Sequence, residues 1–234
     1  MPLTDRLCLL SARFLNEFHE LVGNLYDNKI ISISNPNSYD MPSQIPADYL
    51  GQKKKIAVFV GLIDHFSPKK PDFAIRIWSM VHASLPDWKL IFIGGGKRVS
   101  QLQEMMKDLG TKNVEFHGFQ KPDQYYKEAS ILCMTSLYEG WGMVITEAMQ
   151  HACVPILFDS FAAARDIVEN GISGILIPPI DLTEYARQLK SLALNQKLRE
   201  ELALKAYSSV QRFDVRLIAD QWEECFAGLT AQGN

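Results

Sequence analysis

The sequence predicts an α/β protein whose main domain is a doubly wound parallel sheet of about six strands. Short continuous apolar runs such as IAVFVGLI at 56–63 are typical of strands that helices cover on both faces. These runs alternate with amphipathic stretches of helical length, which is the pattern of a parallel sheet connected by crossover helices. The expected fold is therefore Rossmann-like.

The first part of the chain carries a short pattern of its own. Residues 5–11 predict a buried strand, residues 12–23 an amphipathic helix that stops at Gly23, and residues 29–33 a second strand. Three prolines and several turn formers in 34–48 prevent regular structure there. We interpret this segment as a linker at a domain boundary.

The main domain then follows in regular order. Strands are expected at 56–63, 89–96, 113–119, 130–136, 154–158 and 173–177. Helices are expected at 71–84, 98–109, 122–128 and 142–152, with a short one between the last two strands. The tail over 181–228 predicts further helices, with breaks near Asn195 and at Phe213–Asp214. We divide the chain into residues 1–34, a linker over 35–53, the main domain over 54–212, and a C-terminal helix over 213–234.

Composition excludes several classes of protein. Of the 234 residues, 47% are hydrophobic and 22% are charged, which is too apolar for a disordered chain. A formal net charge of −3 disfavours a nucleic-acid binder that relies on a basic surface. No apolar run approaches the ~18 residues of a transmembrane helix.

The cysteines give no indication of a metal site. Cys8, Cys133, Cys153 and Cys225 are widely spaced, without a CxxC pair or a nearby histidine cluster. We expect free thiols in a reducing cytoplasm, with Cys133 and Cys153 buried. No metal and no cofactor are expected.

Three of the loops that follow expected strands are informative, and two of these carry glycines and lysines. Ligands bind beyond the carboxyl ends of the strands in an open parallel sheet. The loop at 61–70 carries Lys69 and Lys70, and GGGK occupies 94–97. The spacing around GGGK matches neither the dinucleotide-binding GxGxxG fingerprint nor the GxxxxGK[ST] phosphate loop.

The third loop, within 136–155, is the strongest signal for a ligand site. Gly140 and Gly142 flank the expected start of a helix, and the free backbone N–H groups of a helix N-terminus bind anions such as a diphosphate. Glu139 precedes this start and Glu147 lies eight positions later. Carboxylates at that spacing can hold hydroxyls at the two ends of a ligand, which suits a nucleotide-sugar.

A set of ordered motifs resembles a known enzyme family. The E-x7-E segment EGWGMVITE at 139–147 occurs with VGLI…K at 60–69, FIGGGK at 92–97, VEFHGF at 114–119 and EAMQHACVPI at 147–156. Together they resemble retaining glycosyltransferases of the large family 4 (group 1) type, which have the GT-B fold. The resemblance covers about residues 54–210. It implies that the chain is the C-terminal, donor-binding half of a GT-B fold.

The resemblance also implies a role for each motif residue. Glu147 would hold the ribose hydroxyls of the donor nucleotide, and Glu139 the hydroxyls of the donor sugar. Lys69 would neutralise the diphosphate and stabilise the leaving group, so Lys69 and Glu139 are the expected catalytic positions. Further donor contacts are expected at Gly140, Trp141, Gly142, Met143, Val144, Gly61, Gly118, Phe119 and Lys97.

Three departures from the family pattern are visible. Leu62 stands where the family usually has an arginine, which removes one phosphate cation, and Lys70 or Lys97 could compensate. The loop before Lys69 is about two residues longer than usual. Trp141 replaces the usual phenylalanine between the motif glycines.

The expected function is binding of a nucleotide-diphospho-sugar for metal-independent, retaining transfer of the sugar to a glycan or lipid-linked acceptor. On this hypothesis residues 1–34 are the remnant of an acceptor domain, and the helix over 213–234 crosses back to that domain. The chain would be truncated or completed by a partner chain, with little transfer by itself. We expect it in the cytoplasm, or held at the inner face of the membrane by the absent domain.

Other interpretations stay open at this point. The chain could be a non-catalytic nucleotide-sugar binding subunit or a degenerate paralogue that needs a partner domain. An epimerase or phosphorylase on the same fold is a further alternative.

Single residues also have plainer interpretations. Glu139 and Glu147 could be a loop carboxylate and a solvated helix face, and Lys69 a solvated charge. Trp141 could be a surface-anchoring aromatic residue. His151 could hydrogen-bond Glu147 from the same helix face.

Overall fold

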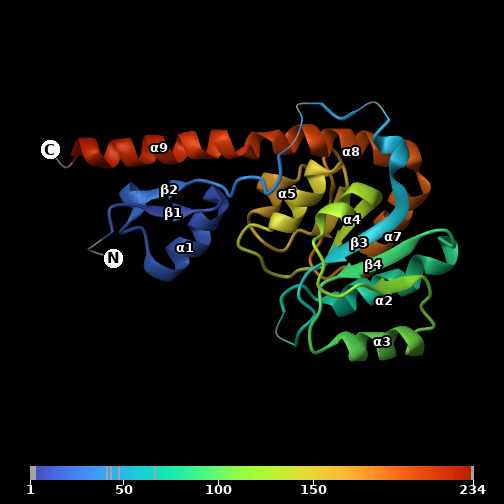
Figure 1. Cartoon of the computed structure of the whole chain (residues 1–234). Helices are drawn as coiled ribbons and strands as arrows, with labels where there is room; N and C mark the ends of the chain where they lie inside the picture. The colour runs from blue at the N-terminus through green and yellow to red at the C-terminus, as the bar shows by residue number, and fades with distance from the viewer. Residues whose placement is uncertain (1–3, 41, 43, 47, 66, 233–234) are drawn as a thin grey trace.

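The computed structural model of the chain describes residues 4–40, 42, 44–46, 48–65 and 67–232. Its main domain is built on one parallel six-stranded sheet (Figure 1). The strands are β3 (Lys54–Val60), β4 (Lys89–Ile93), β5 (Val114–Phe116), β6 (Ala129–Met134), β7 (Val154–Phe158) and β8 (Ile175–Ile177). This confirms the predicted fold class.

The sheet is doubly wound about its centre. Its strand order is β5-β4-β3-β6-β7-β8, and every neighbouring pair is parallel. The chain therefore moves outward from β3 in one direction and then from β6 in the other. The carboxyl ends of β3 and β6 form the switch point of the fold, where ligands bind in sheets of this kind.

Helices cover both faces of the sheet. α2 (Pro71–Val81), α3 (Val99–Asp108) and α7 (Leu182–Leu194) pack on one face. α4 (Asp123–Glu128), α5 (Met143–Gln150) and α6 (Ala164–Ile167) pack on the other, while α8 (Gln196–Val210) contributes to both cores.

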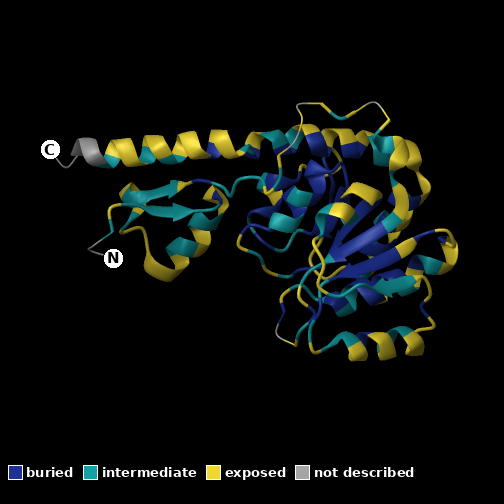
Figure 2. Ribbon diagram, viewed as in Figure 1, coloured by how far each residue is buried: buried dark blue, intermediate teal, exposed yellow. Residues whose placement is uncertain are grey.

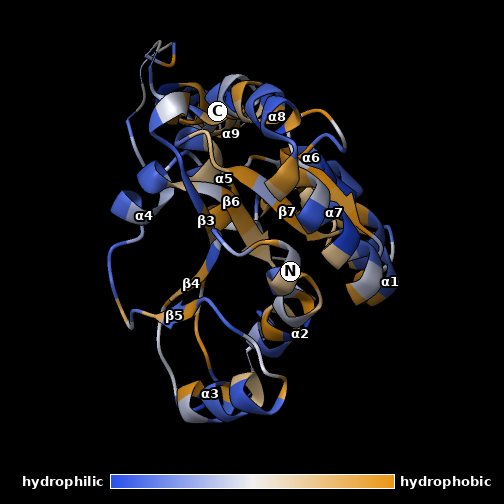
Figure 3. Ribbon diagram, turned by 90° about the vertical axis from the view of Figure 1, so that its right-hand side faces the viewer, coloured by the Kyte–Doolittle hydropathy of each residue, from blue (hydrophilic) through white to orange (hydrophobic). Residues whose placement is uncertain are grey.

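The alternation of side chains along a strand explains these two cores. Ala57 and Phe59 of β3 point into the core under α2, whereas Val58 between them points into the core under α5. Because both faces are covered, the strand is apolar at consecutive positions. Figure 2 shows the sheet buried, and Figure 3 shows β6 and β7 coloured hydrophobic.

Two strands, β4 and β5, end earlier than predicted where glycines with positive φ angles follow them. The expected strand at 89–96 stops at Ile93, and Gly94 and Gly96 then adopt positive φ angles of 129° and 154°. In the helical tail the predicted break near Asn195 is confirmed. The Asn195 side chain accepts a hydrogen bond from the Leu198 amide and so begins α8.

The N-terminal unit pairs β1 (Leu7–Leu9) with β2 (Ile30–Ser32) in parallel, and α1 (Leu15–Val22) connects them. A strand forms within residues 5–11 as predicted, but the prediction that it is buried is wrong, because β1 is only half-buried. Within the described residues β1 has a single neighbouring strand, and the apolar face of α1 is poorly covered, with Leu21 82% exposed. Figure 2 shows little buried surface in this unit.

The remaining segments are 3-10 turns and a long helix. The turns lie at Ala12–Phe14, Asp27–Lys29, Leu50–Gln52, His82–Ser84 and Gln211–Phe213. α9 (Val215–Gln232) begins after the predicted break at Phe213–Asp214 and extends toward the N-terminal unit (Figure 1). None of the helices in the described part of the chain combines the length and the apolar character needed to cross a membrane.

Candidate functional site

The loops that follow β3, β4 and β5 are locked together at the carboxyl edge of the sheet. The Ile63 amide donates to the Gly95 carbonyl at 3.0 Å, and the Gly94 amide donates to the Gly118 carbonyl at 2.7 Å. A Cβ atom on Gly94 would lie only 2.0 Å from the Gly61 carbonyl oxygen. Glycine is therefore required at 94 for the close approach of these loops.

Lys69 and Glu139, the two predicted catalytic residues, form an ion pair with 2.7 Å between Nζ and Oε1. Their side chains are only 18% and 15% exposed. The aliphatic stem of Lys69 lies against Gly61, where a Cβ atom would come within 3.0 Å of Cγ. Thr135 at the end of β6 donates to the backbone carbonyls of Lys69 and Lys70 at 2.9 and 2.8 Å. Contacts from the ends of β3 and β6 thus hold Lys69 at the switch point.

The N-terminus of α5 lies a few residues beyond Glu139. Gly142 precedes the helix with a φ of 90°, and no side chain caps the helix. The first amides of a helix, here those of Met143 and Val144, have no acceptor within the helix. Together with the helix dipole, these groups favour an anion at this position.

Trp141 lies beneath this loop and not on the surface. Its side chain is 3% exposed, and its ring packs edge-on against Phe213 with centroids 5.2 Å apart. The interpretation of Trp141 as a surface-anchoring aromatic residue is therefore wrong. Because Phe213 lies 72 positions later in the printed sequence, no local pattern around the motif indicated this contact.

Glu147 already has two hydrogen-bond donors in this structure. The Tyr126 hydroxyl donates to Oε2 at 3.2 Å, and the Ser38 hydroxyl donates to Oε1 at 2.9 Å. Sequence analysis missed both partners, because Tyr126 lies on another helix and Ser38 in the linker. Burial raises the pKa of Tyr126 well above its ordinary value, so its hydroxyl stays protonated and can donate.

The expected hydrogen bond from His151 to Glu147 is not formed. His151 Nε2 instead lies 3.1 Å from Asp123 Oδ1, and its ring lies near those of Tyr39 and Tyr126. α5 ends at Gln150, and His151 has left helical geometry with a φ of −109°. Its side chain therefore does not continue the helix face of Glu147. Burial lowers the pKa of His151 to about 4.

The predicted donor contacts Phe119 and Lys97 lie in the loops that follow β5 and β4. The Phe119 side chain is 75% exposed, and its ring lies against Gly95, where a Cβ atom would be 2.7 Å from Cε2. His117 bridges the Tyr125 hydroxyl at 3.0 Å and Glu115 at 2.9 Å, which is a structural arrangement. Lys97 is exposed.

The structure also places Leu62 and the two cysteines of the apolar strand segments. Leu62, at the position of the usual arginine, is 48% exposed. Cys133 and Cys153 are buried free thiols, as predicted.

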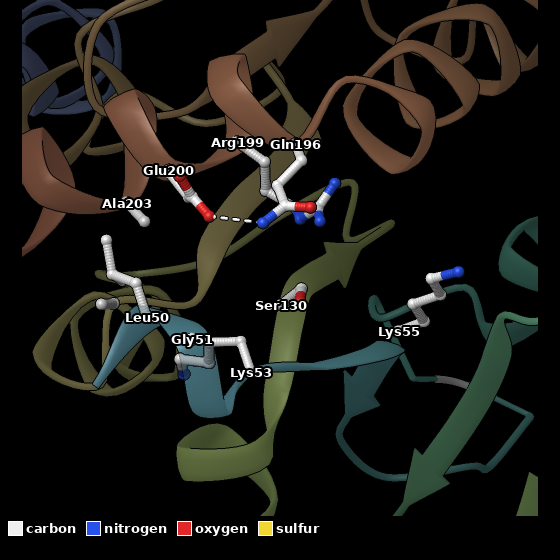
Figure 4. A pocket seen from close by; sticks show the side chains of 10 residues that line it. Leu50, Gly51, Lys53, Lys55, Ser130, Gln196, Arg199, Glu200 and Ala203 are labelled. Carbon is white, nitrogen blue, oxygen red and sulfur yellow. Dashed lines mark hydrogen bonds between the residues drawn. The ribbon is translucent and has the colours of Figure 1, made fainter. Parts of the chain in front are cut away.

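Two cavities lie away from the predicted donor residues. One of about 220 Å³ lies at the amino ends of β3 and β6 (Figure 4), the edge where parallel sheets do not bind their ligands. It is lined by Leu50, Gly51, Lys53, Lys55, Ser130, Ala152, Gln196, Arg199, Glu200 and Ala203.

A second cavity of about 380 Å³ lies between α1 and the loop after β7. Neither cavity includes Lys69, Glu139 or Glu147. In the described residues no cluster of three or more His, Cys, Asp and Glu side chains could hold a metal ion.

Comparisons with known proteins place these features in a family. A family model described as "Glycosyl transferases group 1" matches residues 42–209. The chain is 24% identical over 193 residues to an alpha-1,4-N-acetyl-D-galactosaminyltransferase of Campylobacter jejuni, covering 82% of this chain and 53% of that protein. The first curated relatives found are all longer, and the chain spans between 24% and 54% of their length.

Solved structures share the fold. The chain aligns with HepE of Anabaena in complex with UDP and glucose at a TM-score of 0.82 and 20% identity, over 96% of this chain and 63% of that one. It aligns with the C-terminal domain of a group 1 glycosyl transferase from Francisella tularensis at a TM-score of 0.64 and 22% identity, over 74% of this chain and 96% of that one. Because the family model matches well over half of its residues, the chain belongs to the group 1 glycosyl transferases.

Proposed function

We propose that this chain is the donor-binding domain of a retaining glycosyltransferase that uses a nucleoside-diphosphate sugar. The observation that carries the proposal is the Lys69–Glu139 pair, held at the switch point of the sheet beside the uncapped N-terminus of α5. This arrangement offers a cation and free amides for a diphosphate, and a carboxylate for sugar hydroxyls, at one edge of the sheet.

Donor binding would redistribute the partners of these groups. The Lys69 ammonium turns to the diphosphate, whose negative charge replaces that of Glu139, and the freed carboxylate accepts hydrogen bonds from the sugar. Glu147 accepts from the ribose hydroxyls. Since Lys69 and the α5 amides supply positive charge to the leaving group, the transfer needs no metal ion.

The transfer step itself breaks the bond between the anomeric carbon and the diphosphate oxygen, which leaves with the bonding electrons. An acceptor hydroxyl attacks the same face of the sugar, and its proton passes to the departing phosphate oxygen. Retention of configuration is supported by the name of the Campylobacter relative, an alpha-1,4-N-acetyl-D-galactosaminyltransferase. An α product formed from an α-linked donor such as UDP-glucose requires retention.

The nucleotide and the acceptor are proposed from the relatives. HepE was solved with UDP, so UDP is the first nucleotide to test. The name of the Campylobacter relative contains an undecaprenol diphosphate, which supports a lipid-linked sugar as acceptor. Because this chain spans about half of that relative, the acceptor site would be supplied by another domain, in the same protein or in a partner.

Calorimetry with UDP, GDP, ADP and the matching sugar nucleotides tests the proposal. Glu147→Ala should weaken binding of the preferred nucleoside diphosphate about ten- to hundredfold, since a hydrogen bond to a charged group contributes roughly 1.5–3 kcal/mol. Glu139→Ala should affect mainly the sugar nucleotide. Glu128→Ala, which removes an exposed carboxylate paired with Lys54, is the matched control. Equal affinities in all variants would refute the site.

A non-catalytic subunit is the second candidate, and the exposed Leu62 at the usual arginine position favours it. A radiolabelled UDP-sugar separates the two. Slow donor hydrolysis or transfer supports an enzyme, whereas binding without turnover, even with an added acceptor domain, supports a subunit. Formation of an epimer without any acceptor would overturn both.

A further inference from the structure

We propose that Tyr126 is a positioning residue for nucleotide recognition: its hydroxyl orients the Glu147 carboxylate toward the ribose, and Ser38 completes the same arrangement. The inference rests on the proposed function, in which Glu147 binds the ribose. Neither Tyr126 nor Ser38 belongs to the motif that identifies the donor loop.

Tyr126 is fixed in place independently of any ligand. It is fully buried on α4 in the core beneath α5. Its backbone carbonyl accepts a hydrogen bond from Lys53 Nζ at 2.7 Å, and the same ammonium donates to the Ala129 carbonyl at 3.0 Å. These contacts fix the position of the Tyr126 hydroxyl, which donates to Glu147 Oε2.

The hydrogen-bonding capacity of Glu147 agrees with this role. A carboxylate accepts about four hydrogen bonds, about two on each oxygen. Tyr126 uses one site on Oε2 and Ser38 one on Oε1. About one site then remains on each oxygen, which is the number that the 2′- and 3′-hydroxyls of a ribose require.

Ser38 belongs to a short segment that binds α5 at several points. The next residue, Tyr39, exchanges backbone hydrogen bonds with the Gln150 side chain at the other end of α5. The preceding residue, Asn37, donates its amide to the Phe213 carbonyl at 2.8 Å. Ser38 thus reaches Glu147 from a segment that is anchored on both sides.

The test compares UDP with 2′,3′-dideoxy-UDP in the full chain by calorimetry. Tyr126→Phe should bind UDP about tenfold more weakly than the parent, because a Glu147 carboxylate that is no longer oriented loses a hydrogen bond of about 1.5 kcal/mol to the ribose. Binding of the dideoxy nucleotide, which cannot use Glu147, should change less than about twofold. Ser38→Ala should show the same selectivity with a smaller loss of about threefold, because its hydroxyl is more exposed and water can replace it.

Tyr185→Phe is the matched control. It also removes a buried tyrosine hydroxyl, which donates to the Ile156 carbonyl at 2.6 Å, but it does not contact Glu147. This variant should bind both nucleotides as the parent does. Thermal unfolding of each variant shows whether the loss of the hydroxyl has changed the fold.

The outcomes separate the two proposals. A parent chain that binds UDP better than the dideoxy form, with Tyr126→Phe reducing that preference, supports the inference. If the preference is intact in Tyr126→Phe and Ser38→Ala, the inference is wrong while the proposed function stands. A parent that binds neither UDP, GDP nor ADP overturns both.

Discussion

Replacing Gly94 by alanine tests whether the close approach of the β3 and β4 loops builds the site. The new Cβ atom would lie 2.0 Å from the Gly61 carbonyl oxygen and 2.9 Å from its carbon. An ordinary contact begins near 3.4 Å, so one of two backbones must move by more than 1 Å. The φ of 129° is a further strain for any residue with a side chain.

The expected cost combines these two effects. Overpacking in a closely packed region costs about 1–3 kcal/mol, and an unfavourable backbone conformation costs about 1–3 kcal/mol. Gly94→Ala should therefore lower the free energy of unfolding by about 2–6 kcal/mol. Because Gly61 also supports Lys69, UDP binding should weaken in the fraction that stays folded.

Gly110→Ala provides the control. Gly110 also has a positive φ, 60°, but a Cβ atom there meets nothing within 4 Å. Gly110→Ala should lower the free energy of unfolding only by the cost of its left-handed backbone conformation, about 1–2 kcal/mol. Urea denaturation followed by circular dichroism measures both variants. A Gly94→Ala variant that is no less stable than Gly110→Ala would refute the close-approach argument.

Two further predictions concern residues around the loop that leads into α5. Trp141→Ala should lower the free energy of unfolding by about 3–5 kcal/mol, because the side chain is buried against Phe213. In urea denaturation, replacing the half-buried Trp222 by alanine should lower the free energy of unfolding much less. Equal losses in the two variants would contradict the packing role of Trp141. His151 has a pKa of about 4 in the folded chain, whereas in the unfolded chain it takes up a proton near pH 6.5. Because the unfolded chain binds the extra proton, the free energy of unfolding should fall by up to about 3 kcal/mol as the pH is lowered from 6.5 to 4. His151→Gln should flatten that part of the curve, whereas Asp123, whose pKa is lowered, loses its contribution at lower pH; an unchanged slope in His151→Gln would contradict the assignment.

The fold class was predictable because local patterns encode it. A strand covered on both faces must be apolar at consecutive positions, and Ala57, Val58 and Phe59 supply both cores in turn. The break at Asn195 was predictable for the same reason, since its capping bond reaches only three residues forward.

The parts of the site that sequence did not reveal depend on contacts between distant segments. The loop positions of Lys69 and Glu139 were predictable from strand order, and the structure brings these two side chains together. The donors to Glu147 were not, because Tyr126 lies 21 positions away and Ser38 lies 109. Neither spacing matches a helical or strand period, so no pattern around Glu147 indicated its partners.

The same sequence separations set the order in which the contacts around Glu147 form as the chain is synthesised. Glu147 can meet Tyr126 as soon as β6 and α5 have formed, because Tyr126 lies only 21 positions earlier in the chain. The segment that carries Ser38 is held at two places. Tyr39 bonds the Gln150 side chain, 111 positions later, and the Asn37 side chain donates to the Val210 carbonyl, 173 positions later. Closing so long a loop carries an entropic cost before its contacts form. During synthesis, the Glu147 carboxylate should therefore acquire its tyrosine donor early, whereas the segment that carries its serine donor is fully anchored only after α8 has emerged from the ribosome.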